Sequence, residues 1–507
     1  MTKRKSPELL EQLVLRKICK IIGYWVMEWT HTLLFADGLA HSDRLPMIQS
    51  VLGQCVQLRQ VLASLPVPFG RPLSVQAVEI VAIIMKAYNI ADRFRHGRPV
   101  TTCRRRYEEV CLFIINTMWL PCVVECNVNN VACTFVQELL SKLLKYYPNI
   151  THLVLPHEKN IEMSRYVLSN LRRLTELLDL KFQFVCTTEI VIELGKHCKL
   201  LRSLDIAESK SVTDDCVEYL MNLQSLEVLR INGTSISEAC YALILSSLPR
   251  VQNITWWDSV ERILQNVTKE CLPSVNDFLG TVSDSSFLAK MCPRIKRLSI
   301  RLLNGNSLEL SRLTDVKFLG FVKCDYNINI LSIVVENIGF RLTYLEMFWV
   351  ENIIFSQIFT CCTVLKKLVL RFSEVILHDN EIFSPELPHF KSVAEIILLS
   401  NTGLNNFRKH LHHYVNLKIL RTSWFEALED DTVSEILNAG GFKKLSCILL
   451  GFCGPLTLQT ANLLITRCDD LSVIGNLNTW SGVSEEDKSA LFDFVNRNNL
   501  ELTVILD

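Results

Sequence analysis

The segment Cys198–Ile206 carries a pattern that returns through most of this chain. Its apolar residues Leu201, Leu204 and Ile206 are spaced as L-x-x-L-x-L, in which the last two point the same way from a short strand and the first packs beneath it. Clear copies are Leu226/Leu229/Ile231, Val251/Ile254/Trp256, Ile295/Leu298/Ile300, Leu313/Val316/Phe318, Leu342/Leu345/Met347, Leu365/Leu368/Leu370, Val393/Ile396/Leu398, Leu417/Leu420/Thr422 and Leu445/Ile448/Leu450. Weaker copies are Ile150/Leu153/Leu155, Leu174/Leu177 and Leu471/Ile474. Because one copy cannot bury its apolar face alone, the copies are expected to stack.

The intervals between copies indicate the architecture. From Leu201 onward, the first residues of successive triplets are separated by 25, 25, 44, 18, 29, 23, 28, 24, 28 and 26 residues. Most intervals fall in the range of about 20 to 29 residues that is typical of leucine-rich repeats. We therefore predict an α/β solenoid with parallel inner strands and outer helices. The long interval predicts an insertion or a degenerate repeat within 258–291, and the copy at Leu313 follows too closely to make a full repeat.

A cysteine three residues before the first apolar residue provides a family resemblance. It occurs at Cys198, Cys292, Cys362 and Cys468. The segment Ser211–Leu220, SVTDDCVEYL, is similar to the helix start of cysteine-containing leucine-rich repeats. Together these features resemble the repeats of F-box substrate receptors. We expect the four cysteines to be buried, reduced and free of metal, each filling the turn between a helix and the next strand.

Charge and cysteine usage restrict the class of protein. The 53 basic and 53 acidic residues cancel, which argues against general attraction to nucleic acid or to an anionic membrane. The 19 cysteines are scattered along a long chain, which indicates reduced thiols in an intracellular protein. The longest uncharged apolar stretch, 111–124, is broken by Pro121 and is too short to span a bilayer. We expect a cytoplasmic or nuclear protein without a signal peptide or membrane association.

The N-terminal region resembles adaptor-docking elements. Residues 6–30 have apolar side chains at helical spacing, and Leu10, Val14 and Ile18 repeat every four residues and share one face. The pattern resembles the opening of an F-box and also a BC box, the helix that inserts into elongin. The segment 45–52 is loosely similar to a cullin box. The resemblance implies that the three residues dock a cullin adaptor; the alternative is a helical cap that shields the open end of the solenoid.

Proline and glycine suggest where the chain divides. Residues 65–72 hold three prolines and a glycine, which favours an extended linker and a boundary near 70. The predicted regions are 1–70 (adaptor-docking or cap), 71–147 (helical) and 148–507 (solenoid). Helices are expected in the middle region at 75–90, 107–119 and 135–147.

Motifs of catalysis and cofactor binding are not found. The sequence has no G-x-x-x-x-G-K-[ST], G-x-G-x-x-G, G-x-S-x-G or H-E-x-x-H. Cys122, Cys126 and Cys133 form the densest thiol group and, with His157, suggest a zinc site, but their spacing is not a standard one and a role in the packed core is favoured. We therefore expect a protein that is not an enzyme and has no cofactor or metal.

The strand period predicts which side chains face outward. Residues that alternate with the buried framework project from the concave face, and arginine and aromatic residues dominate protein-interface hot spots. The candidate partner-binding residues are Arg230, Trp257, Arg301, Tyr344, Phe348, Arg371 and Arg421. Trp256, Trp349 and Trp424 are expected to fill gaps between the strand and helix layers. Ile397, Leu399 and Leu449 are expected to form an exposed apolar stripe.

These features favour a protein-interaction function. The leading hypothesis is the substrate-recognition subunit of a cullin-RING ubiquitin ligase, in which the N-terminal helices bind the adaptor and the repeats bind a substrate protein. The alternative is a scaffold or regulatory binding protein without a ligase link. A third hypothesis is a reader of nucleic acid or of a phosphorylated ligand that uses Arg230, Arg301, Arg371 and Arg421.

Overall fold

A computed structural model describes most of the chain. The described residues are 10–37, 39, 41–87, 103–131, 133–156, 161–302, 307–329, 331–377, 383–384, 386–404, 407–423, 428–452 and 454–506. They form two compact units, here called the N-terminal unit (Glu8–Val251) and the C-terminal unit (Gln252–Asp507).

Among the described residues, four helices open the N-terminal unit: α1 (Leu10–Asp37), α2 (His41–Ala63), α3 (Val67–Ala87) and α5 (Cys103–Met118). Helix α1 buries Ile22, Val26, Trp29 and Leu33, which recur at the three- and four-residue spacing of one helical face. This face packs on α3 and α2. The indole Nε1 of Trp29 donates a hydrogen bond of 2.7 Å to Gln54 Oε1 on α2, so this large side chain is buried with its polar atom paired.

The predicted linker at 65–72 is wrong, because α3 begins at Val67 and contains Pro72. Pro68 lies in the first turn, where N–H groups have no partner within the helix and proline costs little. Pro72 lies inside the helix and removes one helical hydrogen bond. Gly70 reflects close packing instead of flexibility: a Cβ there would stand 3.0 Å from Cys122 Sγ. By length and composition α3 would also be able to cross a membrane, a test that buried core helices pass as well, and 44% of its most apolar window is buried.

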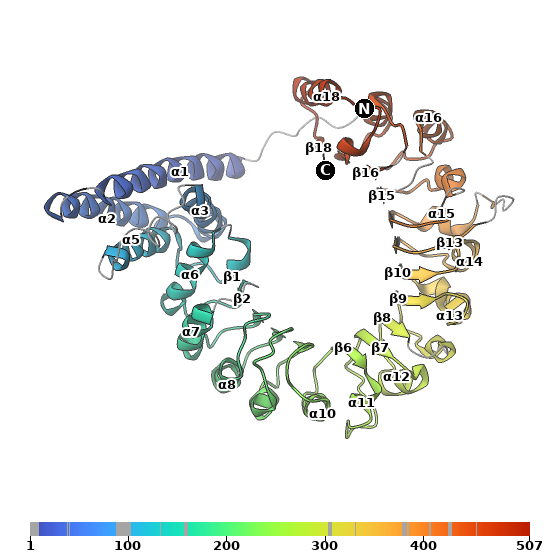
Figure 1. Cartoon of the computed structure of the whole chain (residues 1–507), viewed down its shortest axis with the longest axis horizontal. Coiled ribbons are helices and arrows are strands. Elements are labelled where there is room, and N and C mark those ends of the chain that lie inside the picture. The colour runs from blue at the N-terminus through green and yellow to red at the C-terminus, as the bar shows by residue number, and fades with distance from the viewer. Residues whose placement is uncertain are drawn as a thin grey trace. The chain divides into compact units, whose positions relative to one another are not determined.

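Five parallel strands follow the helices and form one sheet in the order of the chain. They are β1 (Glu125–Asn127), β2 (His152–Val154), β3 (Asp179–Lys181), β4 (Ser203–Asp205) and β5 (Val228–Arg230). The intervening helices are η1 (Val128–Asn130), α6 (Thr134–Leu143), η2 (Leu144–Tyr146), α7 (Ile161–Asn170), η3 (Leu171–Arg173), α8 (Thr188–His197), η4 (Asp214–Cys216), α9 (Val217–Met221) and α10 (Glu238–Ser247). Figure 1 shows α6, α7, α8 and α10 along one side of these strands. This is the predicted repeat architecture.

The pairing of residues between neighbouring strands of this sheet corrects two predictions made from the sequence. Leu153 pairs with Leu180, which in turn pairs with Leu204, so the third repeat is framed by Leu177, Leu180 and Phe182, three residues later than the predicted Leu174/Leu177. The sheet also begins one strand before 148. Cys126 pairs with Leu153 and takes the central framework position of this earlier repeat, which the leucine pattern could not reveal.

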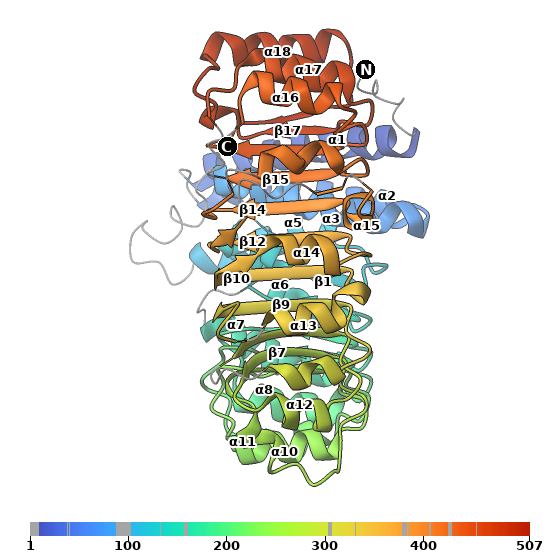
Figure 2. The ribbon, with the colours of Figure 1, turned by 90° about the vertical axis from the view of Figure 1, so that its right-hand side faces the viewer.

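The C-terminal unit contains an eleven-stranded parallel sheet. Its strands are β6 (Asn253–Ser259), β7 (Asp277–Val282), β8 (Arg297–Leu302), β9 (Phe318–Asp325), β10 (Tyr344–Glu351), β12 (Lys367–Arg371), β14 (Glu395–Leu399), β15 (Ile419–Ser423), β16 (Cys447–Gly451), β17 (Val473–Gly475) and β18 (Thr503–Ile505), and β11 (Ile353–Ile354) pairs separately with β13 (Val375–Ile376). Its helices are α11 (Glu261–Leu264), α12 (Ser285–Met291), η5 (Leu308–Arg312), α13 (Leu331–Ile338), η6 (Gly339–Arg341), α14 (Phe355–Cys361), α15 (Pro388–Ser392), η7 (Phe407–His413), α16 (Asp430–Asn438), α17 (Leu458–Arg467), η8 (Leu477–Thr479) and α18 (Glu485–Arg497). Figure 2 shows these strands stacked one above another with the helices in front. Both units are therefore leucine-rich-repeat solenoids.

The long interval at 258–291 holds a complete repeat. Strand β7 pairs with β6 and β8, and Phe278 lies between Ile254 and Leu298. Its third framework position is Gly280, where a Cβ would stand 2.2 Å from Trp256 O. The close approach of this neighbouring backbone explains why an apolar side chain is absent and why the pattern missed the repeat.

The copy at Leu313 is a full repeat in another register. Leu319, not Val316, pairs with Leu298 on one side and with Leu345 on the other. The triplet is therefore Val316/Leu319/Phe321, and the overlapping apolar residue Leu313 produced the earlier frame. Both corrected intervals around this triplet lie within the normal repeat length.

The repeat cysteines are buried as predicted. Cys198, Cys292, Cys362 and Cys468 are each 0% exposed, and all are free thiols. Burial raises the pKa of each thiol to about 12, so they are neutral at physiological pH.

Two histidines lie inside an aromatic cluster of the C-terminal unit. His389 is 0% exposed; its Nε2 lies 3.1 Å from Tyr414 Oη and its Nδ1 lies 3.3 Å from Cys362 O. Burial lowers the pKa of His389 to about 4 and that of His410 to about 4. Both rings are thus neutral in the folded protein near pH 7.

The close approach at Gly280 leads to a stability prediction. We expect Gly280→Ala to lower the free energy of unfolding by roughly 1–3 kcal/mol, because its Cβ meets backbone that must shift. Gly451→Ala is the matched control, since its Cβ would lie 3.2 Å from the mobile end of the Asn476 side chain. Urea unfolding of both variants tests this, and equal losses would contradict the assigned β6–β7 register.

The buried histidine leads to a pH prediction. Between the ordinary value of 6.5 and about 4, the unfolded chain binds a proton at His389 that the folded chain does not. Stability must therefore fall as pH falls through this window, by about 3 kcal/mol for one such group. Unfolding midpoints measured from pH 7 to pH 4 should decline less steeply in His389→Phe than in the wild type. An unchanged slope would show that His389 is protonated in the folded state.

Candidate protein-binding surface

The concave face of the C-terminal unit is formed by residues that alternate with the buried framework. At the start of the strands Asp277, Arg297 and Phe318 are in register on β7, β8 and β9. Arg297 Nε lies 3.7 Å from Asp277 Oδ2, and its guanidinium lies 4.3 Å from the centroid of the Phe318 ring. These side chains are engaged with one another, which removes most of their capacity to bind a partner.

The same row continues on the next three strands. Tyr344 is in register with Phe318 and Lys367, and Lys367 with Glu395. The Tyr344 and Phe318 rings meet edge to face at 4.3 Å, Lys367 Nζ lies 5.2 Å from the Tyr344 centroid, and Lys367 pairs with Glu395 at 2.7 Å. Burial, then the Glu346 carboxylate, raises the pKa of Tyr344 to about 12. The row is a continuous, internally satisfied ladder.

An aromatic cluster lies at the other end of these strands. Phe348 and Trp349 follow one another on β10 with ring centroids 5.0 Å apart, and Phe372, just after β12, lies 5.7 Å from Phe348 and 6.0 Å from Trp349. Trp349 and Phe372 are 43% and 49% exposed. Phe348, Trp349 and Phe372 are called the aromatic edge below. Exposed contiguous aromatic rings of this kind mark interaction surfaces.

The backbone makes these exposed rings unusual. Trp349 and Phe372 have φ of +54° and +50°, a left-handed conformation that is costly for bulky side chains. Lys323, Ser400 and Phe452 occupy the same position of other repeats, also with positive φ. Positive φ is therefore a property of this position in these repeats, and glycine would adopt it with the least strain. Burial of apolar surface does not explain why aromatic residues occupy this position in two adjacent repeats.

Basic side chains lie on both sides of the aromatic edge. Lys323 Nζ lies 4.5 Å from the centroid of the Trp349 ring. Arg371 Nε lies 3.9 Å from Glu346 Oε1. Arg301 is exposed on β8 and is in register with Thr281. Aromatic rings flanked by cations have the composition of a protein-interface hot spot.

The structure brings together only part of the predicted patch. Tyr344, Phe348 and Arg371 lie on adjacent strands β10 and β12. Trp257 (56% exposed) lies on β6 and Arg421 (exposed) on β15, several strands away. Arg230 belongs to the N-terminal unit, where its Nη1 lies 3.5 Å from Oδ2 of the buried Asp205.

Other surface predictions have mixed outcomes. Trp349 does not fill a gap between layers, because its positive φ turns the ring into solvent. Trp256 is half-buried on β6, and Trp424 lies outside the described residues. The exposed apolar stripe is mostly absent: Ile397 is 7% exposed, and Leu399 and Leu449 are half-buried. Neighbouring strands lie close enough for adjacent side chains to cover these aliphatic groups.

The predicted docking face lies at the start of α1. Val14 is 39% exposed, as is its neighbour Leu13. Ile18 is half-buried, and the next residue, Cys19, is 7% exposed and points into the bundle. Leu10 is the first residue of the helix, and its side chain lies outside the described residues.

Metal chemistry has no geometric support in the described part of the chain. No group of three or more His, Cys, Asp or Glu side chains there is arranged to hold an ion. His157, the fourth member of the suggested zinc site, lies outside the described residues. Cys126 instead serves as a framework residue of the first repeat.

No protein-family model and no curated protein matches this sequence. Solved structures with a similar fold include an internalin from Listeria monocytogenes, with 14% identity over 68% of this chain and 92% of that chain and a TM-score of 0.39. A leucine-rich-repeat protein of Leptospira interrogans has 12% identity over 73% and 91% of the two chains, with a TM-score of 0.35. A chain of the yeast Rad7–Elc1 complex has 15% identity over 68% and 87%, with a TM-score of 0.39. These likenesses are too distant to assign a function.

The strained turn at Phe372 leads to a paired prediction. We expect Phe372→Gly to leave the free energy of unfolding within about 1 kcal/mol of the wild type, because relief of left-handed strain offsets the loss of an exposed ring. Phe372→Val should be clearly less stable, since β-branched residues fit positive φ poorly. Urea unfolding compares the two. A glycine variant less stable than the valine variant would mean that packing, not a partner, explains the ring.

Proposed function

We propose that this chain is a protein-interaction subunit that recognises substrate proteins for a cullin-RING ubiquitin ligase. The N-terminal helices bind a cullin adaptor, and the concave face of the C-terminal unit binds the substrate. The chain itself performs no catalysis and needs no cofactor in this role, and it acts in the cytoplasm or nucleus. The observation that carries the proposal is the exposed apolar start of α1, at the place where the sequence resembles an adaptor-docking box.

Two features of α1 support docking at its start. The buried face of the helix begins at Cys19 and continues through Ile22 and Val26, so the preceding turns contribute little to the core of their own unit. Leu13 and Val14 nevertheless are apolar and 39% exposed. An apolar helix start that its own fold leaves open has the geometry of helix-in-groove recognition.

The aromatic edge supports the second half of the proposal. Phe348, Trp349 and Phe372 contact one another, and Lys323 and Arg371 lie beside them. Aromatic and arginine side chains supply most of the binding energy in protein interfaces. A substrate segment that covers these rings would remove apolar surface from water without requiring the ladder from Asp277 to Glu395 to break.

The alternative of a scaffold without a ligase link rests on Ile18. This residue belongs to the predicted docking face but is half-buried, so part of that face already serves the helical bundle. The nucleic-acid hypothesis has less support, because Arg230 and Arg371 each face a carboxylate within the chain. Paired cations release fewer counterions and bind phosphate less well.

Capture of purified adaptors tests the proposal. The full chain should retain either the F-box adaptor or the elongin pair, and Val14→Glu should weaken that capture at least about tenfold, which corresponds to 1.4 kcal/mol. The unfolding midpoint should stay unchanged because Val14 is exposed. Gln12→Glu, which adds the same charge at an exposed position on the same helix, should bind normally. Failure of the wild type to retain either adaptor favours the scaffold.

A further inference from the structure

Basic side chains outnumber acidic ones on the concave face of the C-terminal unit. The positions of β7 to β15 that alternate with the buried framework are called the outward rows below. Their acidic residues are Asp277, Glu346 and Glu395, and each lies within ion-pair distance of a basic side chain of the same rows. Arg301 and Arg421 of these rows are exposed and have no ion-pair or hydrogen-bond partner among the described residues. This face therefore keeps a positive charge that attracts an acidic partner.

Arg301 and Arg421 lie on opposite sides of the aromatic edge. Val322 of β9 pairs with Phe348 of β10, and Arg301 lies on β8, the strand beyond Val322. On the other side, Arg421 of β15 pairs with Ile397 of β14, which is the neighbour of β12. Since neighbouring strands lie about 4.8 Å apart, each arginine is roughly 10 Å from the strand that carries the nearest ring.

The charged side chains next to the rings leave no positive surplus there. Exposed glutamates stand two residues after Trp349 and two residues after Phe372, beyond the turn of positive φ. The charged residues next to the rings are Lys323, Glu346, Glu351, Arg371 and Glu374. Because acidic residues outnumber basic ones in this set, a partner's carboxylate gains little beside the rings. A carboxylate over either unpaired arginine is attracted without such opposition.

We propose that the aromatic edge and the two arginines bind an extended acidic segment of the substrate protein, with bulky apolar residues at its centre and a carboxylate on each side. An extended chain advances roughly 3.3 Å per residue, so about three residues separate each carboxylate from the apolar centre. The centre covers Phe348, Trp349 and Phe372, and the carboxylates pair with Arg301 and Arg421. Its identity as a substrate segment rests on the proposed function above.

Other classes of ligand fit these features less well. A purely apolar segment would cover the rings but leave the two arginines without a partner. A basic segment would be repelled by them. A nucleic-acid strand carries phosphates along its whole length, so it would also place negative charge beside the exposed Glu351 and Glu374. Only a segment whose charges flank an apolar centre matches both the rings and the arginines.

Calorimetric titration of the full-length protein with synthetic peptides tests the inference. The reference peptide is acetylated and amidated, and holds a phenylalanine–leucine pair with one glutamate three residues before it and one three residues after it, separated by serine and glycine. It should bind at least about tenfold more tightly than the same peptide with lysines in place of the glutamates. Moving both glutamates next to the apolar pair, or replacing the pair by serines, should also weaken binding.

Variants locate the binding to this surface. Arg301→Glu and Arg421→Glu should each weaken binding of the reference peptide at least about fivefold, because each reverses one charge that faces a carboxylate. Trp349→Ser should weaken it as much, and serine suits this turn because Ser400 occupies the same position with positive φ. The unfolding midpoint should not change in any of the three, since all these side chains are exposed.

Matched controls lie at the other end of the strands. Arg294 is exposed just before β8, and Phe340 is 52% exposed in η6, before β10 begins. Arg294→Glu makes the same charge change as Arg301→Glu, and Phe340→Ala removes a ring as exposed as that of Trp349. Both variants should bind the reference peptide as the wild type does.

Four results would overturn the inference. They are equal binding of the glutamate and lysine peptides, undiminished binding by Arg301→Glu and Arg421→Glu, no binding of the reference peptide at millimolar concentration, or tighter binding of an oligothymidylate that displaces it. Adaptor capture by the same protein keeps the two proposals apart. A protein that retains an adaptor but not the peptide rejects this inference alone. One that binds the peptide but no adaptor rejects the ligase role and leaves the acidic-segment site in place.

Discussion

The stacking of one buried apolar residue in the middle of each strand is the constraint on which this structure depends. In the C-terminal unit these residues, such as Leu319, Leu345 and Leu368, are 0% exposed and pair strand to strand in register. Because side chains alternate along a strand, burying this position forces its two neighbours outward in every repeat. The outward residues consequently form straight rows, and the ladder that runs from Asp277 to Glu395 is one such row.

The same constraint also determines which outward-facing side chains contact one another. Within one row, charged and aromatic side chains satisfy each other, as Lys367 does with Tyr344 and Glu395. The end of the strands is free of this constraint, because the repeat turns there through positive φ and the framework no longer dictates the residue type. Trp349 and Phe372 stand there, exposed and strained. Strain of this kind persists only when the surrounding fold imposes it, and it gathers at functional positions.

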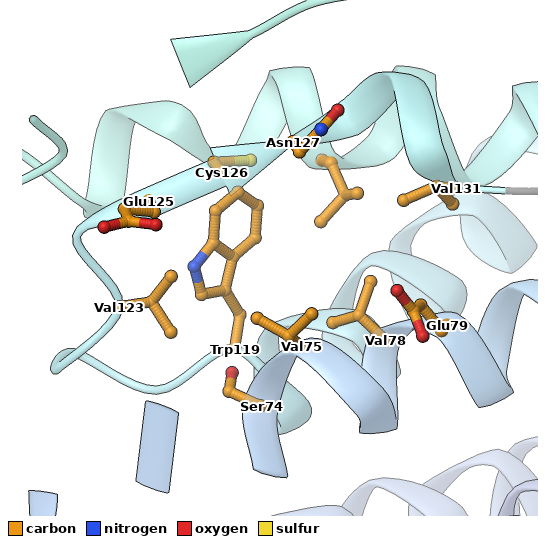
Figure 3. A pocket seen from close by; sticks show the side chains of 11 residues that line it. Ser74, Val75, Val78, Glu79, Trp119, Val123, Glu125, Cys126, Asn127 and Val131 are labelled. Carbon is orange, nitrogen blue, oxygen red and sulfur yellow. The ribbon is translucent and has the colours of Figure 1, made fainter. Parts of the chain in front are cut away.

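The N-terminal end of the repeat array has different neighbours from the repeats in its interior. The first strand, β1, has no preceding repeat, and the helices of the N-terminal unit close this end. At this junction Trp119 is one of the residues that line a small pocket (Figure 3), and its buried Nε1 has no hydrogen-bond partner among the described residues. Repeat arrays need caps, and caps introduce residues that the repeat does not control.

The sequence by itself determined the solenoid, the inward and outward assignment of most strand positions and the burial of the repeat cysteines, because a fixed period and a two-residue alternation are local properties. It failed where another residue filled a framework position, as at Cys126 and Gly280, and where prolines at 65–72 stood inside a helix. Only the tertiary structure decided that Phe348, Trp349 and Phe372 meet, that Arg230 lies in a different unit, and that Trp119 and Glu125 line one pocket. These depend on register between strands and on packing between distant segments, which single-residue patterns do not encode.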